Sequence, residues 1–307
     1  GEGRFVSIRG GEASLNNVTL NGHSLASTAE SRATALDLLP ASMVSSIEVI
    51  KAVTPDMDGN SVGGTINVNT LSAFDRSGSF AFGNLTARHH ERVTSFGDRK
   101  TPYEANFTAG TTFGPENKFG VVVSGNASRR DYIATIFNPQ DWEDINDNGI
   151  MVPEAHENGI EDNERERFGV NANLDYRPSP VASAYLRAHY SRTQEFDENQ
   201  EYIFELAEGD LTNQTSTSGR FAAGEGELDS DLDDEMEYLY SFTLGGDYRL
   251  GGVLWEAAAT HTRGLLDRFN RDMHFDTGDR EDFASVYDVS HSELSIFPEQ
   301  PLTVKNP

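Results

Sequence analysis

A two-residue period of polar and apolar side chains constrains this 307-residue chain more than any other feature. From Tyr103 to Phe113, for example, aromatic and small residues at odd positions alternate with polar residues at even positions. Successive side chains of a strand point to opposite faces, so this period predicts strands with one apolar and one polar face. Seven such segments are expected, and the first is the least regular: 79–88, 103–113, 119–129, 167–177, 182–193, 237–250 and a last one that begins at Val253.

The links between these segments alternate in length. After a medium link at 89–102, tight links alternate with long ones: 114–117, then about 130–166, then 178–181, then about 194–236, then 251–252. Outer-membrane barrels have short turns on one side and long loops on the other, and their strands need about 9 to 11 residues to cross a bilayer. A soluble sandwich has no physical reason for this alternation, so the links favour an antiparallel transmembrane β-barrel.

Aromatic residues cluster at both ends of the predicted strands, on the apolar phase. One group lies beside the tight turns and a second group lies at the opposite ends: Phe113, Phe119, Tyr176, Tyr248 and Trp255, then Tyr103, Phe168, Tyr190 and Tyr238. Two aromatic belts are typical of a barrel at its two membrane interfaces.

The composition agrees with this interpretation and excludes others. Only 36% of residues are hydrophobic and the mean hydropathy is −0.53, which disfavours a helical membrane protein but not a barrel. The net charge of −26 is concentrated in the long links, which argues against nucleic acid as a partner because phosphate binding needs the opposite sign. An acidic surface rich in hydroxyl and amide groups suits polar sugars or cationic ligands. Cysteine is absent, so thiolate metal sites are excluded.

The first 73 residues differ in character and predict a small α+β unit. A short helix is expected at Ala33–Leu39, a strand at Ile47–Val53, a turn at Thr54–Asn60 and a last strand at Thr65–Thr70.

Five ordered sequence pieces in this unit carry a family resemblance. They are Ile8-Arg9-Gly10, Val18-Thr19-Leu20-Asn21-Gly22, Leu39-Pro40, Ile47-Glu48-Val49-Ile50-Lys51 and Gly63-Gly64-Thr65-Ile66-Asn67-Val68. In this order they resemble the C-terminal half of the plug of TonB-dependent outer-membrane receptors. The sequence of residues 54–64, TPDMDGNSVGG, resembles that of a proteobacterial branch of this family linked to oligosaccharide or siderophore uptake.

The resemblance implies a mainly β fold in two domains. Residues 1–73 would be the C-terminal half of the plug, and residues 74–307 would be the first seven or eight strands of a barrel of about 22. The chain is therefore expected to be a fragment, without the signal peptide, the TonB-contacting segment, the first half of the plug and the last barrel strands.

The function implied by the resemblance is active transport across the outer membrane of a Gram-negative bacterium. The inner-membrane TonB complex would pull on the plug, and the ligand, an oligosaccharide or a ferric siderophore, would bind between the extracellular loops and the plug apex. Passive diffusion through a porin and sugar binding by a soluble β-protein are the alternatives. The expected ligand-binding residues lie in the loop after Asn21-Gly22: His23, Ser24, Ser27, Glu30, Ser31 and Arg32.

Contacts between plug and barrel are expected at four plug residues: Arg9, Glu48, Gly63 and Gly64. Glycine permits close approach of backbone, and buried charges need partners. The candidate partners on the polar face of the strands are Arg167, Arg177, Arg187 and Asp175.

One loop has the spacing of a calcium site. Asp144, Asn146 and Asn148 stand at positions 1, 3 and 5 with Gly149 at 6, as in an EF-hand loop, but position 12 is Ala155 rather than an acid. A structural calcium ion is therefore one possibility and a solvated turn the other, and no other cofactor is expected. His89 and His90 are expected to face opposite sides of a strand end rather than to bind metal. The sequence contains no nucleophile elbow, HExxH motif or P-loop, so an enzyme is not expected.

Overall fold

The computed structural model describes residues 4–29, 31–52, 61–89, 91, 101–207, 209–276, 284–290 and 295–298. Two compact units are present. The first unit contains residues 1–131, 164–195 and 234–268, and the second unit contains residues 132–163, 196–233 and 269–307. Among the described residues, no helix is both long and apolar enough to cross a membrane.

The N-terminal domain, residues 4–75 of the first unit, is built on a four-stranded sheet of order β2-β1-β4-β3. β1 (Asn16–Leu20) turns through Asn21 and Gly22, both at positive φ, into β2 (His23–Ser24), because an Asn-Gly pair suits the tight turn of a hairpin. β4 (Gly64–Thr70) runs parallel to β1 and antiparallel to β3 (Val44–Ile50).

Single 3-10 turns take the place of α-helices in this domain. The helix expected at Ala33–Leu39 is wrong: only η2 (Leu36–Leu38) is helical there, and η3 (Ala41–Met43) follows Pro40. The physical reason is that Pro40 restricts Leu39 to an extended backbone, which leaves too few residues for an α-helix. The other 3-10 turns of the domain are η1 (Ala13–Leu15) and η4 (Ala73–Asp75), and a fifth, η5 (Pro115–Asn117), lies in a tight turn of the large sheet. The turn predicted at Thr54–Asn60 lies outside the described residues.

Apolar side chains from the strands and turns form the core of the N-terminal domain. The core comprises Ile8, Val18, Leu20, Leu25, Ala35, Leu38, Leu39, Met43, Ile66 and Val68, together with Leu239 from the large sheet. Leu239 shows that this core is completed by a strand of the neighbouring domain.

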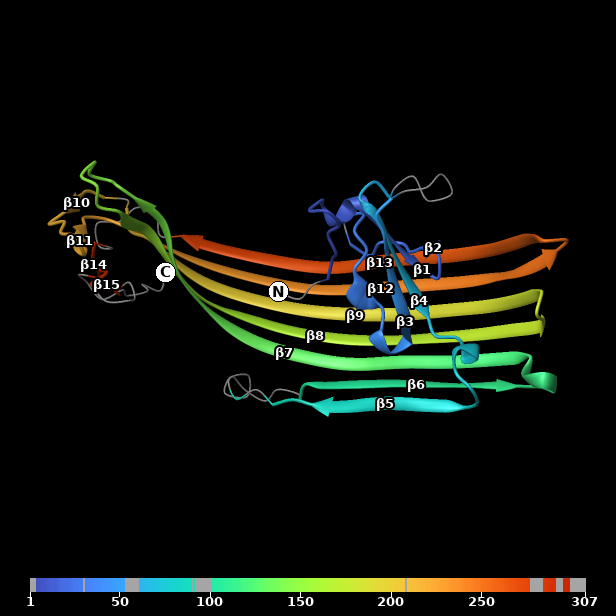
Figure 1. Cartoon of the computed structure of the whole chain (residues 1–307). Coiled ribbons are helices and arrows are strands. Elements are labelled where there is room, and N and C mark those ends of the chain that lie inside the picture. Colours follow the sequence, from blue (N-terminus) through green and yellow to red (C-terminus); the bar gives the residue numbers. More distant parts are fainter. Residues whose placement is uncertain are drawn as a thin grey trace. The chain divides into compact units, whose positions relative to one another are not determined.

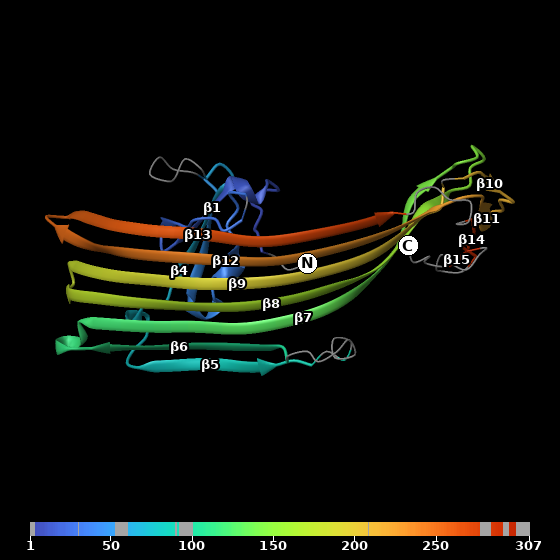
Figure 2. The same ribbon diagram turned by 180° about the vertical axis from the view of Figure 1, so that it is seen from behind.

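A seven-stranded sheet of order β13-β12-β9-β8-β7-β6-β5 forms the rest of the first unit and extends into the second (Figures 1 and 2). Its strands are β5 (Phe80–Ala87), β6 (Tyr103–Phe113), β7 (Phe119–Glu143), β8 (Val152–Ser179), β9 (Ala182–Glu205), β12 (Glu225–Leu250) and β13 (Val253–Asp276). Residues far apart in sequence are thus neighbours, since β12 pairs with β9. The mainly β fold expected from the sequence is confirmed.

The long links predicted at 130–166 and 194–236 are shorter than expected, because the strands continue into them. β8 has 28 residues and β12 has 26, against the 9 to 11 that a bilayer requires. The backbone hydrogen bonds of a strand do not depend on apolar side chains, so the ladder continues where the polar-apolar alternation has ended. The polar-apolar alternation therefore predicted the part of each strand that has one apolar face, but it did not predict where the strand ends.

The two faces of the large sheet in the first unit have opposite environments. Apolar side chains such as Phe107, Phe168 and Phe242 are exposed, whereas polar side chains of the opposite phase are buried beneath the N-terminal domain. In Figure 1 the N-terminal domain lies in front of the strands, and in Figure 2 it lies behind them. This arrangement is the inverse of that in a soluble sheet, whose apolar face is the one that packs on the core.

The exposed face carries the two aromatic rows that the sequence predicts. Phe119 stacks on Phe113 and on Tyr176, with ring centroids 5.5 and 4.6 Å apart, beside the tight turns. At the other end of the apolar band, the ring centroids of Phe168 and Tyr190 lie 6.2 Å apart. The position of a bilayer against these rows stays a prediction.

The second unit contains a small antiparallel sheet of order β10-β11-β14-β15. Its strands are β10 (Leu211–Thr212), β11 (Ser218–Phe221), β14 (Ser285–Asp288) and β15 (Ser295–Pro298). Val152, Leu206, Leu211, Phe221 and Tyr287 form its own core.

Gly264 is expected to set how closely the N-terminal domain approaches β13. A Cβ atom there would lie 2.0 Å from the carbonyl oxygen of Ser27, and the amide of Ala26 donates to Thr262 Oγ1 at 3.1 Å. Gly264→Ala should displace the loop that contains Ala26 and Ser27, at a cost of about 1 to 3 kcal/mol. Because a loosened loop is a better protease substrate, trypsin should cut at the exposed Arg32 about tenfold faster than in the wild type.

Ala259→Val provides the matched control for this prediction. It adds volume to an exposed position of the same strand, and its tryptic cleavage should equal that of the wild type. Unchanged cleavage of Gly264→Ala would contradict the close approach.

Candidate functional site

A buried polar interface joins the N-terminal domain to the large sheet within the first unit. The side chains that the sheet contributes are hydroxyl, amide, imidazole and carboxylate groups: Thr108, Ser124, Asn171, Asn173, Asp175, His189, Ser191, Thr193, Glu237, Ser241 and Thr243. Polar groups cost free energy when they are buried without partners, so their partners decide how firmly the two parts are held together.

Arg4 lies at the centre of a charge cluster in this interface. Its guanidinium lies 2.6 Å from Glu237 Oε1 on β12, 3.6 Å from Glu195 Oε2 on β9 and 3.3 Å from Asp37 Oδ2. The side chain of Glu237 is only 3% exposed. One N-terminal arginine therefore connects the domain to two strands of the sheet.

Arg167 on β8 extends the cluster to a third strand. Its Nη2 atom donates to Asp37 Oδ2 at 2.7 Å, so Asp37 accepts from the sheet and from Arg4. Burial raises the pKa of Asp37 above its ordinary value, although Arg167 and Arg4 favour the charged form. The charge on Asp37 thus depends on both arginines being in place.

Hydrogen bonds fix the domain at a second place, where η4 meets β8. Ser72 Oγ donates to Asp175 Oδ2 at 3.0 Å, and Asn173 Nδ2 donates to the carbonyl oxygen of Leu71 at 2.7 Å. The guanidinium of Arg177 lies 4.1 Å from the ring centroid of Phe74. The side chains of Ser72, Asn173 and Asp175 are short, so the two hydrogen bonds leave little conformational freedom at this place.

The two-residue period correctly predicted most of the residues by which the large sheet contacts the N-terminal domain. Asp175, Arg167 and Arg177 all contact the N-terminal domain, whereas Arg187 forms an ion pair with Asp175, 2.5 Å away within the sheet.

Three of the four plug residues expected to contact the barrel, Glu48, Gly63 and Gly64, have neighbours within the N-terminal domain. A contact of these residues and of Arg9 with the barrel stays a prediction. Glu48 accepts from Asn67 and Asn69, and a Cβ on Gly63 would meet Asn16. A Cβ on Gly64, at φ +141°, would meet the carbonyl oxygen of Ile50. Arg9 is exposed at positive φ. These glycines allow β4 to pack closely against its neighbours within the domain, because a Cβ at either position would clash with them.

Arg4 and Asp37 were missed because both lie outside regular strands, where no period marks them. The available signal was a charged residue between core positions, since Asp37 stands between Leu36 and Leu38 in a run of apolar residues. A buried charge requires a partner.

The residues predicted to bind ligand do not form one cluster of free groups. Ser27 Oγ bonds within its own loop, to the carbonyl oxygens of Ser31 and Ala33, and Ser24 Oγ accepts from Asn17. Ser31 and Arg32 are exposed, His23 is half-buried, and Glu30 lies outside the described residues. Their role in ligand binding stays a prediction.

The predicted calcium loop is closed by its own hydrogen bonds. Both carboxylate oxygens of Asp144 accept from the backbone, from Asn148 N at 2.9 Å and Gly149 N at 2.7 Å. The side chains of Asn146 and Asn148 donate to Gln214. The three residues do come together in one turn, and calcium binding there stays a prediction.

The second unit is strongly acidic. It contains 27 of the 50 Asp and Glu residues of the chain but only 4 of the 24 Lys and Arg residues, and so carries most of the net charge of −26. Alternate residues of β12 from Glu225 to Asp233 are all acidic, which places their carboxylates on one face of the strand. Such a surface attracts cations and repels anions.

One carboxyl group of the second unit, that of Glu154, has a raised pKa. A hydrogen bond to Glu143, with burial and the nearby charges of Glu143, Asp141 and Glu205, raises the pKa of Glu154 to about 7.

Residues 1–65 match the family model of the TonB-dependent Receptor Plug Domain. None of the curated proteins matches this chain. The recognition of a TonB-dependent receptor plug in the sequence is confirmed.

Solved structures of low similarity are also found. The siderophore receptor PirA from Acinetobacter baumannii shares 10% identity at a TM-score of 0.33, covering 93% of this chain and 52% of that one. A mutant ferric enterobactin receptor, PfeA, from Pseudomonas aeruginosa shares 11% identity at 0.33, covering 92% and 52%. The FrpB iron transporter from Neisseria meningitidis shares 8% identity at 0.29, covering 91% and 55%. The chain spans about half the length of these structures, and TM-scores of this size carry no functional argument.

Arg4→Ala should loosen the N-terminal domain in the full-length protein. It leaves Glu237 buried without its partner, and breaking a buried pair costs about 3 kcal/mol. The urea concentration at which trypsin begins to cut at Arg32 should fall accordingly. Arg88→Ala is the control, since its pair with Glu104 is exposed and worth less than about 1 kcal/mol. An equal effect of both variants would show that the Arg4 cluster does not hold the domain.

Glu143→Gln should lower the pKa of Glu154 from about 7 toward its ordinary value, because it removes the main cause of the shift. A pKa raised by folding favours the folded form below about pH 4.5, and this contribution is lost as the pH rises toward 7. Carbon-13 NMR of glutamate-labelled protein would follow the titration, with Asp147→Asn as the nearby control. A wild-type protein without any glutamate titrating near pH 7 would contradict the raised pKa of Glu154.

Proposed function

We propose that this chain, whose first 65 residues form a TonB-dependent receptor plug domain, belongs to an outer-membrane transporter that takes up a scarce ligand with energy delivered through TonB. The observation that carries the proposal is the seating of this plug domain on the polar face of a sheet whose other face is apolar and exposed. A passive pore has no use for such a domain, so the porin alternative loses its support.

The polar character of the interface supports movement of the plug. The Arg4 cluster and the Asn173 and Asp175 contacts consist of groups that water can also satisfy. An interface of this kind can open and re-form, whereas separating a large apolar interface would expose hydrophobic surface to water. We infer that a pull transmitted through the plug opens the path for the ligand.

Between the two expected cargo classes, the charge of the second unit favours a neutral oligosaccharide. Ferric siderophore complexes that carry negative charge would be repelled by the acidic strand ends, whereas sugar hydroxyl groups can donate to carboxylates. The proposed ligand-binding groups of the plug are the exposed Ser31 and Arg32 with the half-buried His23 at the β1–β2 hairpin. Binding and transport of this kind need no covalent step.

Uptake by cells that express the full-length receptor tests the proposal. Radiolabelled maltodextrins and ferric siderophores are offered to cells with and without TonB, and cells that lack the receptor provide the background. We expect accumulation of the oligosaccharide only when TonB and the receptor are both present. Accumulation that does not depend on TonB would overturn the mechanism, and accumulation of the ferric siderophore alone would overturn the cargo assignment.

A further inference from the structure

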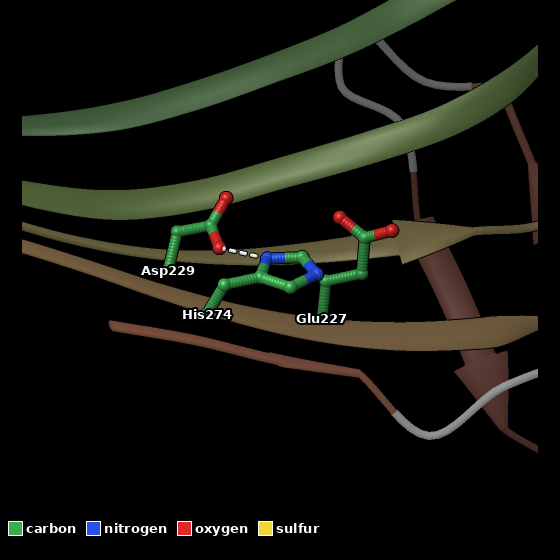
Figure 3. Close-up of side chains that lie close together, drawn as sticks. All are labelled: Glu227, Asp229 and His274. Carbon is green, nitrogen blue, oxygen red and sulfur yellow. Dashed lines mark hydrogen bonds and ion pairs between the residues drawn. The ribbon is translucent and has the colours of Figure 1, made fainter. Parts of the chain in front are cut away.

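Three side chains of metal-binding type converge in the second unit (Figure 3). Glu227 and Asp229 lie on β12 and His274 lies on β13, and one ligand atom from each lies within 4.8 Å of the other two. Figure 3 shows the imidazole of His274 between the carboxylates of Asp229 and Glu227.

The sheet itself brings these residues together. Residues two apart on β12 share a face, so Glu227 and Asp229 point the same way, and β13 is the hydrogen-bonded neighbour of β12. His274 Nδ1 lies 2.5 Å from Asp229 Oδ1, which orients the ring. The side chain of His274 is 56% exposed, so an ion can reach it from solvent.

The donor set suits a divalent transition metal. One imidazole nitrogen and two carboxylate oxygens bind Zn²⁺ at about 2.0 to 2.2 Å, and adjacent ligands of a tetrahedral ion stand about 3.3 Å apart, as these bond lengths require. Small side-chain rotations bring atoms within 4.8 Å of one another to that spacing. Three protein ligands leave the fourth position to water. The imidazole favours this class of metal over Ca²⁺ and Mg²⁺, which prefer oxygen ligands alone.

The surroundings of the three residues favour a cation. Asp229 and His274 border a cavity of about 410 Å³ that is also lined by Asp231, Asp233 and Asp272. Carboxylates lining a hollow raise the local concentration of cations. Asn270 donates to Asp233 Oδ1 at 2.8 Å, which helps to hold the two strands side by side at this place.

We propose that Glu227, Asp229 and His274 bind one divalent transition-metal ion, which would bridge β12 and β13. The site is separate from the Asp144 loop in residue composition and in ligand chemistry, and it does not depend on the identity of the transported ligand.

Calorimetric titration of the full-length receptor with Zn²⁺, without an affinity tag and in excess Mg²⁺, tests the proposal. We expect one binding event, and a loss of at least about tenfold in affinity in His274→Ala and Asp229→Asn, because even groups that only orient a metal ligand change affinity by 10- to 100-fold. Asp272→Asn is the matched control, since it removes the same charge from the same cavity but no ligand atom. Its affinity should change far less.

Three outcomes would overturn the site. These are equal Zn²⁺ affinity of His274→Ala and the wild type, an equal loss in Asp272→Asn and Asp229→Asn, and displacement of Zn²⁺ by Mg²⁺. The last two would indicate general attraction to an acidic surface. Because His274 is exposed, its replacement by alanine should leave folding intact, and an unchanged tryptic pattern would confirm this.

Discussion

The structure depends on one constraint: the polar face of the large sheet must be satisfied within the first unit. Eleven polar side chains on that face are buried, and a buried polar group without a partner costs free energy comparable to a lost hydrogen bond. The N-terminal domain supplies partners for several of them through Arg4, Ser72 and the backbone carbonyl oxygens of Ser42 and Leu71. The N-terminal domain therefore provides hydrogen-bond partners that the polar face of the large sheet would otherwise have to find in water.

Charge placement follows from the same constraint. Arg4 and Arg167 meet around Asp37, so the anion that burial would neutralise is kept near two cations. Such a cluster is specific, since moving the domain by one strand would leave Glu237 unpaired. It is also reversible, because each of its members is well hydrated when separated. The proposed transport requires both properties.

The second unit shows a different balance. Its strands carry few apolar side chains, yet the backbone ladder of β8, β9, β12 and β13 continues, and a small separate core around Phe221 and Tyr287 packs beside it. Negative charge that would destabilise a compact interior is tolerated on hydrated strand surfaces. The same charge makes this unit a place where neutral sugars and metal cations are favoured over anions.

The sequence alone determined that the seven segments of the large sheet are strands, which phase of each is polar, and that the N-terminal residues resemble a receptor plug. These properties are local: the two-residue period of Tyr103–Phe113 and the Asn21-Gly22 turn are encoded within a few positions. Only the tertiary structure decided where β7, β8 and β9 end, because backbone pairing depends on the neighbouring strand and not on side-chain pattern. Likewise, Arg4 meets Glu237 across 233 positions, and His274 meets Asp229 across 45. Contacts at such separations depend on strand order and register, which no local pattern in a single sequence specifies.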